Sequence, residues 1–276
     1  MPTLVKKLNQ VRHGNVGRRF TLPWKLLRPA WRKTAAVATG GRGFRHIVNG
    51  VDEFRLSLEL SHNFEPYNWE PEEYREVMAT VARGDHFIDV GSFWGLFSLG
   101  AAKRVGPTGR VVAIEPGPRQ SSILRSNIAS NNFESIINCI DSVCADKIGE
   151  RIDFFIDPEG SMVDSAVPNP ERKTIAVSRT TTTIDALVSK FGLSPSVIKI
   201  DVEGFEDLVL RGAQQTLEEY KPILFVELHP QQLAVRNVET EDVIGLLEQR
   251  GFKCEELSDR AAVRPGHLYK FRKPQL

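Results

Sequence analysis

The chain has little cysteine and no long hydrophobic run. Its 276 residues include three cysteines, an odd number, and none of them forms a CxxC pair. This scarcity argues against a disulfide framework and against a cysteine-ligated zinc site, and it suits a reducing compartment. No stretch approaches the roughly 20 apolar residues of a membrane span, and the N-terminus lacks the apolar core of a secretory signal. We therefore expect a cytoplasmic protein.

Acidic residues are absent from the first 50 positions, where many lysines and arginines stand beside Trp24 and Trp31. The net charge of the whole chain is only +1, so the remainder is acidic. Tryptophan beside basic residues favours contact with an anionic membrane surface, at the inner face of a membrane. An arm that binds nucleic acid and a solvated, partly disordered leader are the alternatives. We predict a basic N-terminal extension over residues 1–50.

Residues 51–276 are predicted to form one α/β domain. Hydrophobic residues make up 41% of the chain and charged residues 26%, as in soluble globular proteins. Short apolar strands alternate with helices, which is typical of parallel βαβ units with both sheet faces covered. The expected strands are 87–91, 110–116, 136–140, 151–156, 197–202 and 223–228, followed by an antiparallel pair at 252–257 and 267–271; the expected helices are 71–84, 96–102, 123–128, 184–191, 205–217 and 241–251.

Polar side chains stand where two of these strands end. Asp201 and Glu203 follow the strand in KIDVEG, and Glu227 and His229 follow the strand in ILFVELHP. Residues two apart on a strand share a face, and ligands of open α/β sheets bind beyond the carboxyl ends of the strands. If the two strands are neighbours, these four groups converge on one edge of a pocket.

A glycine loop and a distant acid indicate an adenosine cofactor. The first strand leads into DVGSFWG, and Glu115 ends the next strand 20 positions after Gly95. An acid at that distance is placed to accept hydrogen bonds from the ribose hydroxyls of an adenosine. The loop is not GxGxxG and makes a poor cradle for a pyrophosphate, whereas Asp89 suits an ammonium group. S-adenosylmethionine therefore fits better than NAD.

DVGSFWGLFSL, VVAIEPGP, SNIASNN and above all IKIDVEGFEDLVLRGA with PILFVELHP resemble the FkbM-type family of S-adenosylmethionine-dependent methyltransferases. The resemblance runs from about Glu70 to His229 and leaves the N-terminal 65 residues uncovered. It departs from the family at SFW, where a small residue and asparagine are more usual.

The resemblance implies a doubly wound, mostly parallel seven-stranded sheet with an antiparallel C-terminal strand. It also implies O-methylation, commonly of hydroxyls of sugars, glycans or secondary metabolites. By similarity, one set of residues surrounds the cofactor: Asp89, Gly91, Ser92 and Gly95 at the methionine part, Glu115 and Pro116 at the ribose, and Ser142 and Val143 near the adenine.

The acids and the histidine at the strand ends suit activation of an alcohol. An alcohol is a poor nucleophile until its proton is removed, and His229 is the candidate general base. Asp201 would orient the acceptor, while Glu203 and Glu227 would bind neighbouring hydroxyls. The structural alternatives are that Glu203 caps the following helix and that His229 is a turn residue. Magnesium or manganese held by the cluster is a less favoured alternative, so we predict no metal.

Two other functions compete with O-methyl transfer. A nucleic-acid methyltransferase would use the basic arm, but the catalytic region shows no NPPY-type amine site and no basic face, which makes nucleic acid an unlikely partner. A catalytically idle, membrane-attached binding protein would keep the glycine loop and have no use for the carboxylates.

Two further segments each allow more than one role. Trp69 and its neighbours would stack on a sugar, close over the cofactor or pack as a hydrophobic staple. Residues 161–170 would form a substrate lid or a surface loop.

Overall fold

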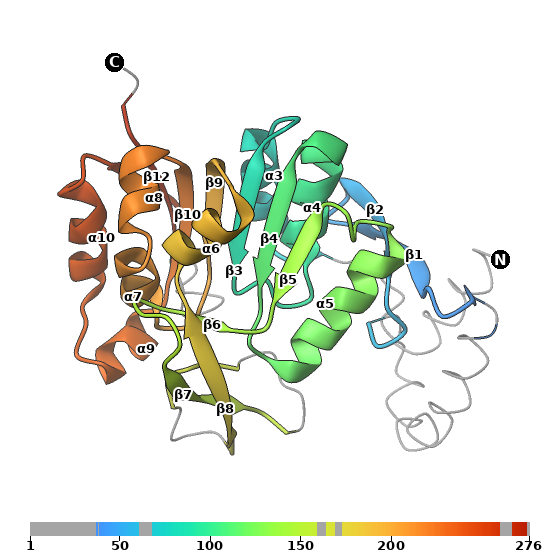
Figure 1. Ribbon diagram of the computed structural model, residues 1–276, viewed down its shortest axis with the longest axis horizontal. Helices are drawn as coiled ribbons and strands as arrows, with labels where there is room; N and C mark the ends of the chain where they lie inside the picture. The colour runs from blue at the N-terminus through green and yellow to red at the C-terminus, as the bar shows by residue number, and fades with distance from the viewer. Residues whose placement is uncertain are drawn as a thin grey trace.

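The computed structural model describes residue 37 and residues 39–60, 68–158, 164–168, 173–259 and 267–274. Its centre is a seven-stranded sheet with the strand order β11-β12-β10-β9-β3-β4-β5 (Figure 1). The strand β12 runs antiparallel to both of its neighbours, and the other paired strands are parallel. The predicted fold class is therefore confirmed. The strands are β3 (His86–Val90), β4 (Arg110–Ile114), β5 (Ile137–Ile140), β9 (Pro195–Ile200), β10 (Ile223–Leu228), β11 (Lys253–Asp259) and β12 (His267–Arg272).

Helices cover both faces of the sheet. Successive strand residues point to opposite faces, so neighbouring residues lie in different apolar clusters. Phe87 lies in one buried apolar cluster and Ile88 in the other. The first cluster joins the sheet to α3 (Pro71–Thr80), α4 (Leu96–Val105) and α5 (Pro118–Ser130). The second joins it to α6 (Ile184–Phe191), α7 (Glu206–Arg211), α8 (Gln214–Glu219), α9 (Pro230–Val235) and α10 (Thr240–Glu248). A short 3₁₀ helix, η2 (Gly106–Thr108), leads from α4 into β4.

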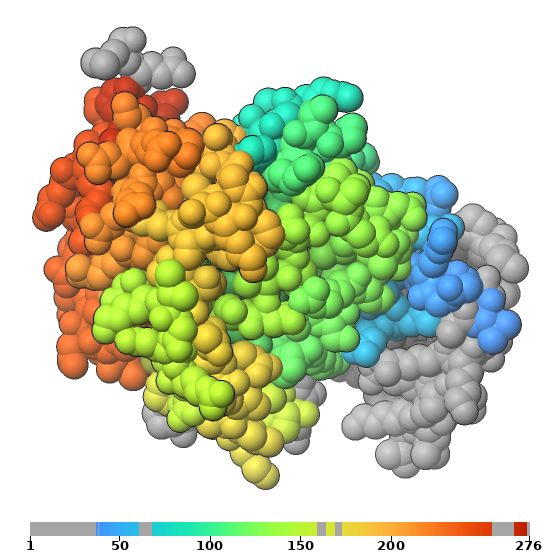
Figure 2. Space-filling view, in the orientation of Figure 1, coloured from blue at the N-terminus to red at the C-terminus, as the bar shows by residue number. Residues whose placement is uncertain are grey.

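An antiparallel hairpin precedes the main domain in sequence and packs at the side of α5 (Figures 1 and 2). It consists of β1 (Phe44–Val48) and β2 (Asp52–Leu56). The backbone N–H of Ser57, just after the hairpin, donates to Asn127 Oδ1 of α5 at 2.7 Å. The predicted boundary at residue 50 thus falls in the turn of a hairpin that belongs to the domain. Trp24 and Trp31, which carried the membrane prediction, lie outside the described residues.

Two predicted helices have different bounds. The first, α3, ends at Thr80 instead of Gly84, because Val81 already has an extended backbone. The helix predicted over 205–217 is two short helices that break at Gly212. A Cβ on Gly212 would lie 2.1 Å from the carbonyl oxygen of Ala145, so the chain passes directly over another backbone there. Asp185 then supplies the start of α8 by accepting the Thr216 N–H at 2.8 Å.

A second sheet of three strands, β6 (Val143–Cys144), β8 (Ile175–Thr182) and β7 (Arg151–Ile156), lies at the carboxyl-end edge of the main sheet. It projects from the main body as a lobe (Figure 2). The hydroxyl of Ser165, in the described part of the predicted lid, donates to the Glu203 carbonyl at 2.9 Å. The strand β7 confirms the strand that was predicted from Arg151. No helix within the described ranges is both long and apolar enough to cross a bilayer.

Candidate active site

The carboxyl ends of β3, β4 and β9 border an open cavity of about 810 Å³. Glu115 and Gln120 lie on one wall, Phe93 and Trp69 on another, and Asp201 and Glu203 follow β9. The small second sheet adds Phe154 and, beyond it, Asp164. The cavity therefore connects the predicted cofactor acid with the predicted catalytic acids.

Glu115 is a buried carboxylate that is fixed by the backbone on both sides. Its Oε2 accepts the Phe93 N–H and its Oε1 accepts the Gly117 N–H, each at 2.7 Å. Burial raises the pKa of Glu115 to about 8, although both backbone donors favour the ionised form. The carboxylate thus holds the glycine loop to the end of β4 and keeps lone pairs for a ligand in the cavity.

The two glycines of this loop are required by close packing. Gly91 has a φ of 80°, and a Cβ there would lie 1.8 Å from the Asp201 carbonyl oxygen. Gly95 has a φ of 84°, and its Cβ would lie 2.3 Å from the Leu124 side chain. Gly91 therefore lets the loop after β3 lie directly against the end of β9, which brings the predicted cofactor loop next to the predicted catalytic acids.

Phe93 stands in the loop with a φ of 51°, a left-handed conformation that is strained for a bulky residue. Its ring stacks on Trp94 with a centroid distance of 4.2 Å and, with an offset, on Trp69 at 6.2 Å. Aromatic stacking stabilises the position that the backbone disfavours. Phe93, from the SFW departure from the family pattern, thus lines the cavity together with Trp69.

Three buried oxygens around the loop have no hydrogen-bond partner within the described part of the chain. They are Asp89 Oδ1, Ser92 Oγ and Gln120 Oε1. The other oxygen of Asp89 accepts the Ser98 hydroxyl at 2.5 Å. Unsatisfied buried acceptors are costly, and Gln120 lines the cavity, where the ammonium, hydroxyl or adenine amino donors of S-adenosylmethionine would satisfy its oxygen. The residues present therefore fit this cofactor.

Half of the predicted cofactor residues line the cavity, namely Gly91, Glu115, Pro116 and Val143. The other four, Asp89, Ser92, Gly95 and Ser142, are not part of its wall. Sequence reasoning missed Gln120 and Asp164, which do line it. Gln120 follows VVAIEPGP on the first turn of α5, a signal that was available, whereas Asp164 comes from an insertion with no local pattern.

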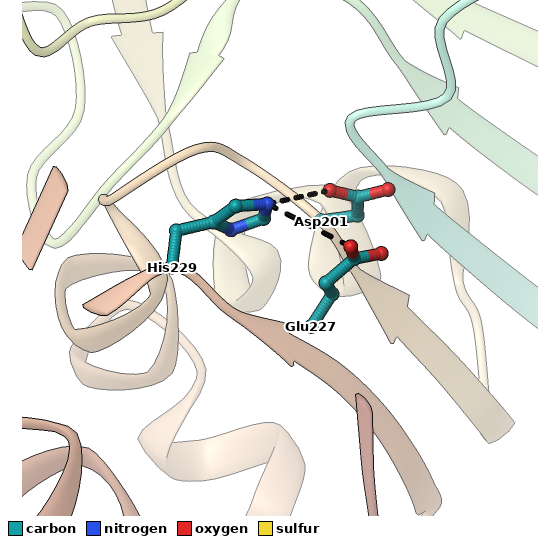
Figure 3. Close-up of side chains that lie close together, drawn as sticks. All are labelled: Asp201, Glu227 and His229. Atoms are coloured by element: carbon teal, nitrogen blue, oxygen red, sulfur yellow. Dashed lines mark ion pairs between the residues drawn. The ribbon is translucent and has the colours of Figure 1, made fainter. Parts of the chain in front are cut away.

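The structure brings the four predicted catalytic residues together. Because β9 and β10 are adjacent and Val226 pairs with Ile200, Glu227 follows beside Asp201. His229 Nε2 lies 3.7 Å from Asp201 Oδ1 and 3.8 Å from Glu227 Oε1 (Figure 3). It lies 3.6 Å from Glu203 Oε2. Asp201 and Glu203 face the cavity with 23% of each side chain exposed, while Glu227 and His229 lie buried behind them.

Glu206 holds the ring of His229 and was missed by sequence reasoning. Its Oε1 lies 2.8 Å from His229 Nδ1 and also accepts the Gly204 N–H at 3.0 Å, and the residue is fully buried. Burial lowers the pKa of His229, but the carboxylates of Glu203, Glu206 and Asp201 outweigh it and raise that pKa to about 10. The ring therefore points Nε2 at the acids in a fixed orientation.

Lys199 is a second residue that the sequence did not single out. It is 3% exposed, and its Nζ lies 3.0 Å from Asp201 Oδ2 and 4.7 Å from the centroid of the Phe97 ring. Burial disfavours its charge, but the carboxylates of Asp201, Asp89 and Glu227 outweigh it, so the pKa of Lys199 is raised. Its position two residues before Asp201, on the same strand face, was the available signal.

The structural alternatives for Glu203 and His229 do not account for their contacts. The N-cap of α7 is Phe205, with no side-chain capping bond, and Glu203 Oε2 instead accepts Gln232 Nε2 at 3.0 Å. His229 is the N-cap residue of α9, as the turn alternative expects, but its ring makes no capping bond and contacts the acids instead. Glu203 also has a φ of 54°, a left-handed conformation that is typical of functional sites.

The chain matches one protein family over most of its length. The family model for the methyltransferase FkbM domain matches residues 57–254, more than half of the chain. Over 61 residues the chain is 34% identical to an arsenite methyltransferase of Halobacterium salinarum. These residues make up 22% of this chain and 16% of that relative, so the match covers only a small part of the relative's length.

Solved methyltransferase structures are similar at low identity. A methyltransferase FkbM from Methylobacillus flagellatus is 18% identical, with a TM-score of 0.46 over 78% of this chain and 52% of that chain. A putative rRNA-methylase from Clostridium thermocellum is 12% identical, with a TM-score of 0.48 over 75% of this chain and 97% of that chain.

Proposed function

Because the chain belongs to the FkbM methyltransferase family, with S-adenosylmethionine as its cofactor, we propose that it transfers a methyl group to a hydroxyl oxygen. The observation that carries the proposal is the shared cavity: Glu115 lies at one end, and Asp201 and Glu203 lie at the other. Two carboxylates facing the bound molecule are acceptors for hydroxyl hydrogens. A sugar, glycan or secondary metabolite with several hydroxyls is the acceptor that this wall suits.

The proposed mechanism uses position first and proton transfer second. S-adenosylmethionine, when bound, supplies an electrophilic methyl group on a sulfonium. Asp201 and Glu203 hold the acceptor hydroxyl in line with it, which by itself supplies a large part of the acceleration. One of these carboxylates takes the hydroxyl proton as the new bond forms. His229 and Glu227 lie directly behind them, with Glu206 fixing the ring.

Lys199 completes this arrangement from the other side. Its ammonium pairs with Asp201 Oδ2, which leaves Oδ1 directed toward the histidine side of the cluster. The pairing holds the plane of the Asp201 carboxylate, so that its oxygens have a constant direction. A fixed acceptor of this kind is what preorganised catalysis requires.

The test is methyl transfer from labelled S-adenosylmethionine to separate pools of free sugars, glycans, lipid-linked glycans and RNA. We expect label in a hydroxyl-bearing pool, with the product identified as a methyl ether by mass spectrometry and NMR. Asp201→Asn should lower turnover with the fold retained, because the two side chains have nearly the same shape. Label found only on RNA bases or amines would refute O-methyl transfer and favour the nucleic-acid alternative.

Composition alone supports a further partner. The acid-free segment before Asp52 is proposed to hold the enzyme at an anionic membrane surface, where lipid-linked hydroxyl acceptors would be within reach. Contact of this segment with a membrane is separable from catalysis, since the cavity is built from residues 69–205.

A further inference from the structure

We infer that Asp201, Glu227 and His229 form a binding site for one divalent cation of the magnesium and manganese class, behind the acceptor end of the cavity. This proposal departs from the sequence-based prediction of no metal and takes up the alternative of magnesium or manganese held by the cluster. The role of the ion in the reaction rests on the proposed function, whereas its binding does not.

The spacing of the three ligand atoms supports this inference. One atom from each residue lies within 4.8 Å of the others, and His229 Nε2 is 3.7 Å from Asp201 Oδ1 and 3.8 Å from Glu227 Oε1. These separations are too long for hydrogen bonds. Ligand atoms about 2.1 Å from one ion lie roughly 3 to 4 Å apart, depending on the angle between them. The three atoms therefore surround a space of the right size for an ion.

The histidine is a second, independent observation. It is 4% exposed, and its Nε2 points at both carboxylates from 3.7 and 3.8 Å, which is beyond hydrogen-bond distance (Figure 3). Its Nδ1 is held by Glu206 at 2.8 Å. Metal-binding histidines usually present one ring nitrogen to the ion and the other to a carboxylate. The ring is thus oriented as a ligand would be.

The balance of buried charge points the same way. Five carboxylates lie around this point, and the ammonium of Lys199 pairs with Asp201 among them. A divalent cation would be attracted to the place where the acids converge. The five are Asp89, Asp201, Glu203, Glu206 and Glu227.

The ligand set selects the class of ion. Two carboxylates are hard ligands that suit magnesium and manganese, and one imidazole moves the preference toward manganese. Both metals use more ligands than these three, and Asp201, with 23% of its side chain exposed, connects the site to the cavity. The remaining positions would be taken by water and by the acceptor hydroxyl oxygen.

The ion gives the proposed reaction a stronger nucleophile. A hydroxyl bound to a divalent cation loses its proton more readily, and Glu203, 3.6 Å from the same histidine nitrogen, is placed to take that proton. The oxygen then forms its bond to the methyl carbon as the carbon–sulfur bond breaks, and the electron pair returns to sulfur. The products are the methyl ether, the demethylated cofactor and the protonated carboxylate.

The site is tested by titrating Mn²⁺ into EDTA-treated full-length protein and measuring free Mn²⁺ by EPR. We expect one ion per chain. Glu227→Gln and Asp201→Asn should each weaken binding about tenfold or more, and Glu206→Gln should weaken it about 10- to 100-fold by releasing the ring. Glu241→Gln, an exposed acid on α10, is the matched control and should leave binding unchanged.

Affinity for S-adenosylhomocysteine reports the fold of each variant, because Glu115 lies on another strand. With that affinity retained, absence of a bound ion in the wild type, or equal binding in Glu227→Gln and Asp201→Asn, would overturn the site. If the wild type binds Mn²⁺ in the titration but methylates its acceptor at the full rate in the presence of EDTA, the proposed role of the ion in the reaction is wrong. If the wild type binds Mn²⁺ but no acceptor pool yields a methylated hydroxyl, the metal site stands and the proposed function is refuted.

Discussion

Replacing Glu115 by alanine should weaken the binding of S-adenosylhomocysteine about a hundredfold. The Glu115 carboxylate is held by two backbone N–H donors at 2.7 Å, so it meets a ligand without reorganising. A hydrogen bond to a charged group contributes about 1.5 to 3 kcal/mol, and two ribose hydroxyls donate to this one group. Losing both costs at least about 3 kcal/mol, which is roughly a hundredfold in the dissociation constant.

The same substitution removes the acceptors of the Phe93 and Gly117 N–H groups. Water from the open cavity would replace them, so the loss of stability should be about 1 to 2 kcal/mol, or a few degrees in melting temperature. Glu115→Gln should not restore binding. Its amide can accept from one backbone N–H, but its NH₂ group would face the other donor.

Calorimetry at pH 9, where Glu115 is ionised, measures this effect directly. Glu72→Ala, an exposed acid on α3, is the control and should bind like the wild type. A Glu115→Ala protein that still melts cooperatively and binds within about threefold of the wild type would refute the ribose assignment. Tighter binding of NADH than of S-adenosylhomocysteine by the wild type would refute the choice of cofactor.

Three further predictions concern the ionisation of Glu115, the packing of Gly91 and the basic N-terminal segment. Burial raises the pKa of Glu115 to about 8, and the ionised form is the better acceptor of ribose hydroxyls. Affinity for S-adenosylhomocysteine should therefore rise with pH through about pH 8 and level off above about pH 9, and a flat calorimetric profile would contradict this. Gly91→Ala puts a Cβ 1.8 Å from the Asp201 carbonyl at a φ of 80°, so it should lower stability by about 3 kcal/mol or more and displace Asp201, as measured by thermal melting and turnover; wild-type values for both would show that the loop relaxes freely. Deleting residues 1–35 should leave cofactor affinity unchanged and reduce sedimentation with anionic vesicles at low salt, and full-length protein that ignores such vesicles would exclude the membrane proposal.

Local patterns in the sequence were enough to predict the sheet. Runs such as VVAIEP and VIKIDV are apolar on both faces, which is how strands buried between two helical layers read. The end of such a run marks the ligand edge of the sheet, so Glu115 and Asp201 could be placed there without coordinates. The antiparallel last strand and the number of seven strands came from the family resemblance, and the structure confirms both.

Other features depend on contacts between residues far apart in sequence. The break at Gly212 exists because Ala145 lies against it. The hairpin at residues 44–56 is held by Asn127 of α5 and by Asn131, which caps the end of that helix. Nothing in the local sequence names these partners. Helical periodicity through Gly212 favours one continuous helix, and the tertiary approach of another backbone overrides it.

In the predicted catalytic cluster, too, the sequence determines some features and only the tertiary structure decides others. The spacing of Asp201, Glu203, Glu227 and His229 predicts that they meet, because neighbouring parallel strands end at one edge. Spacing along a strand does not say which of them faces the cavity, nor that Glu206 reaches back from α7 to hold His229. Depth and second partners are decided by how the helices pack on the strand ends, since that packing determines which polar groups lose water and which keep it.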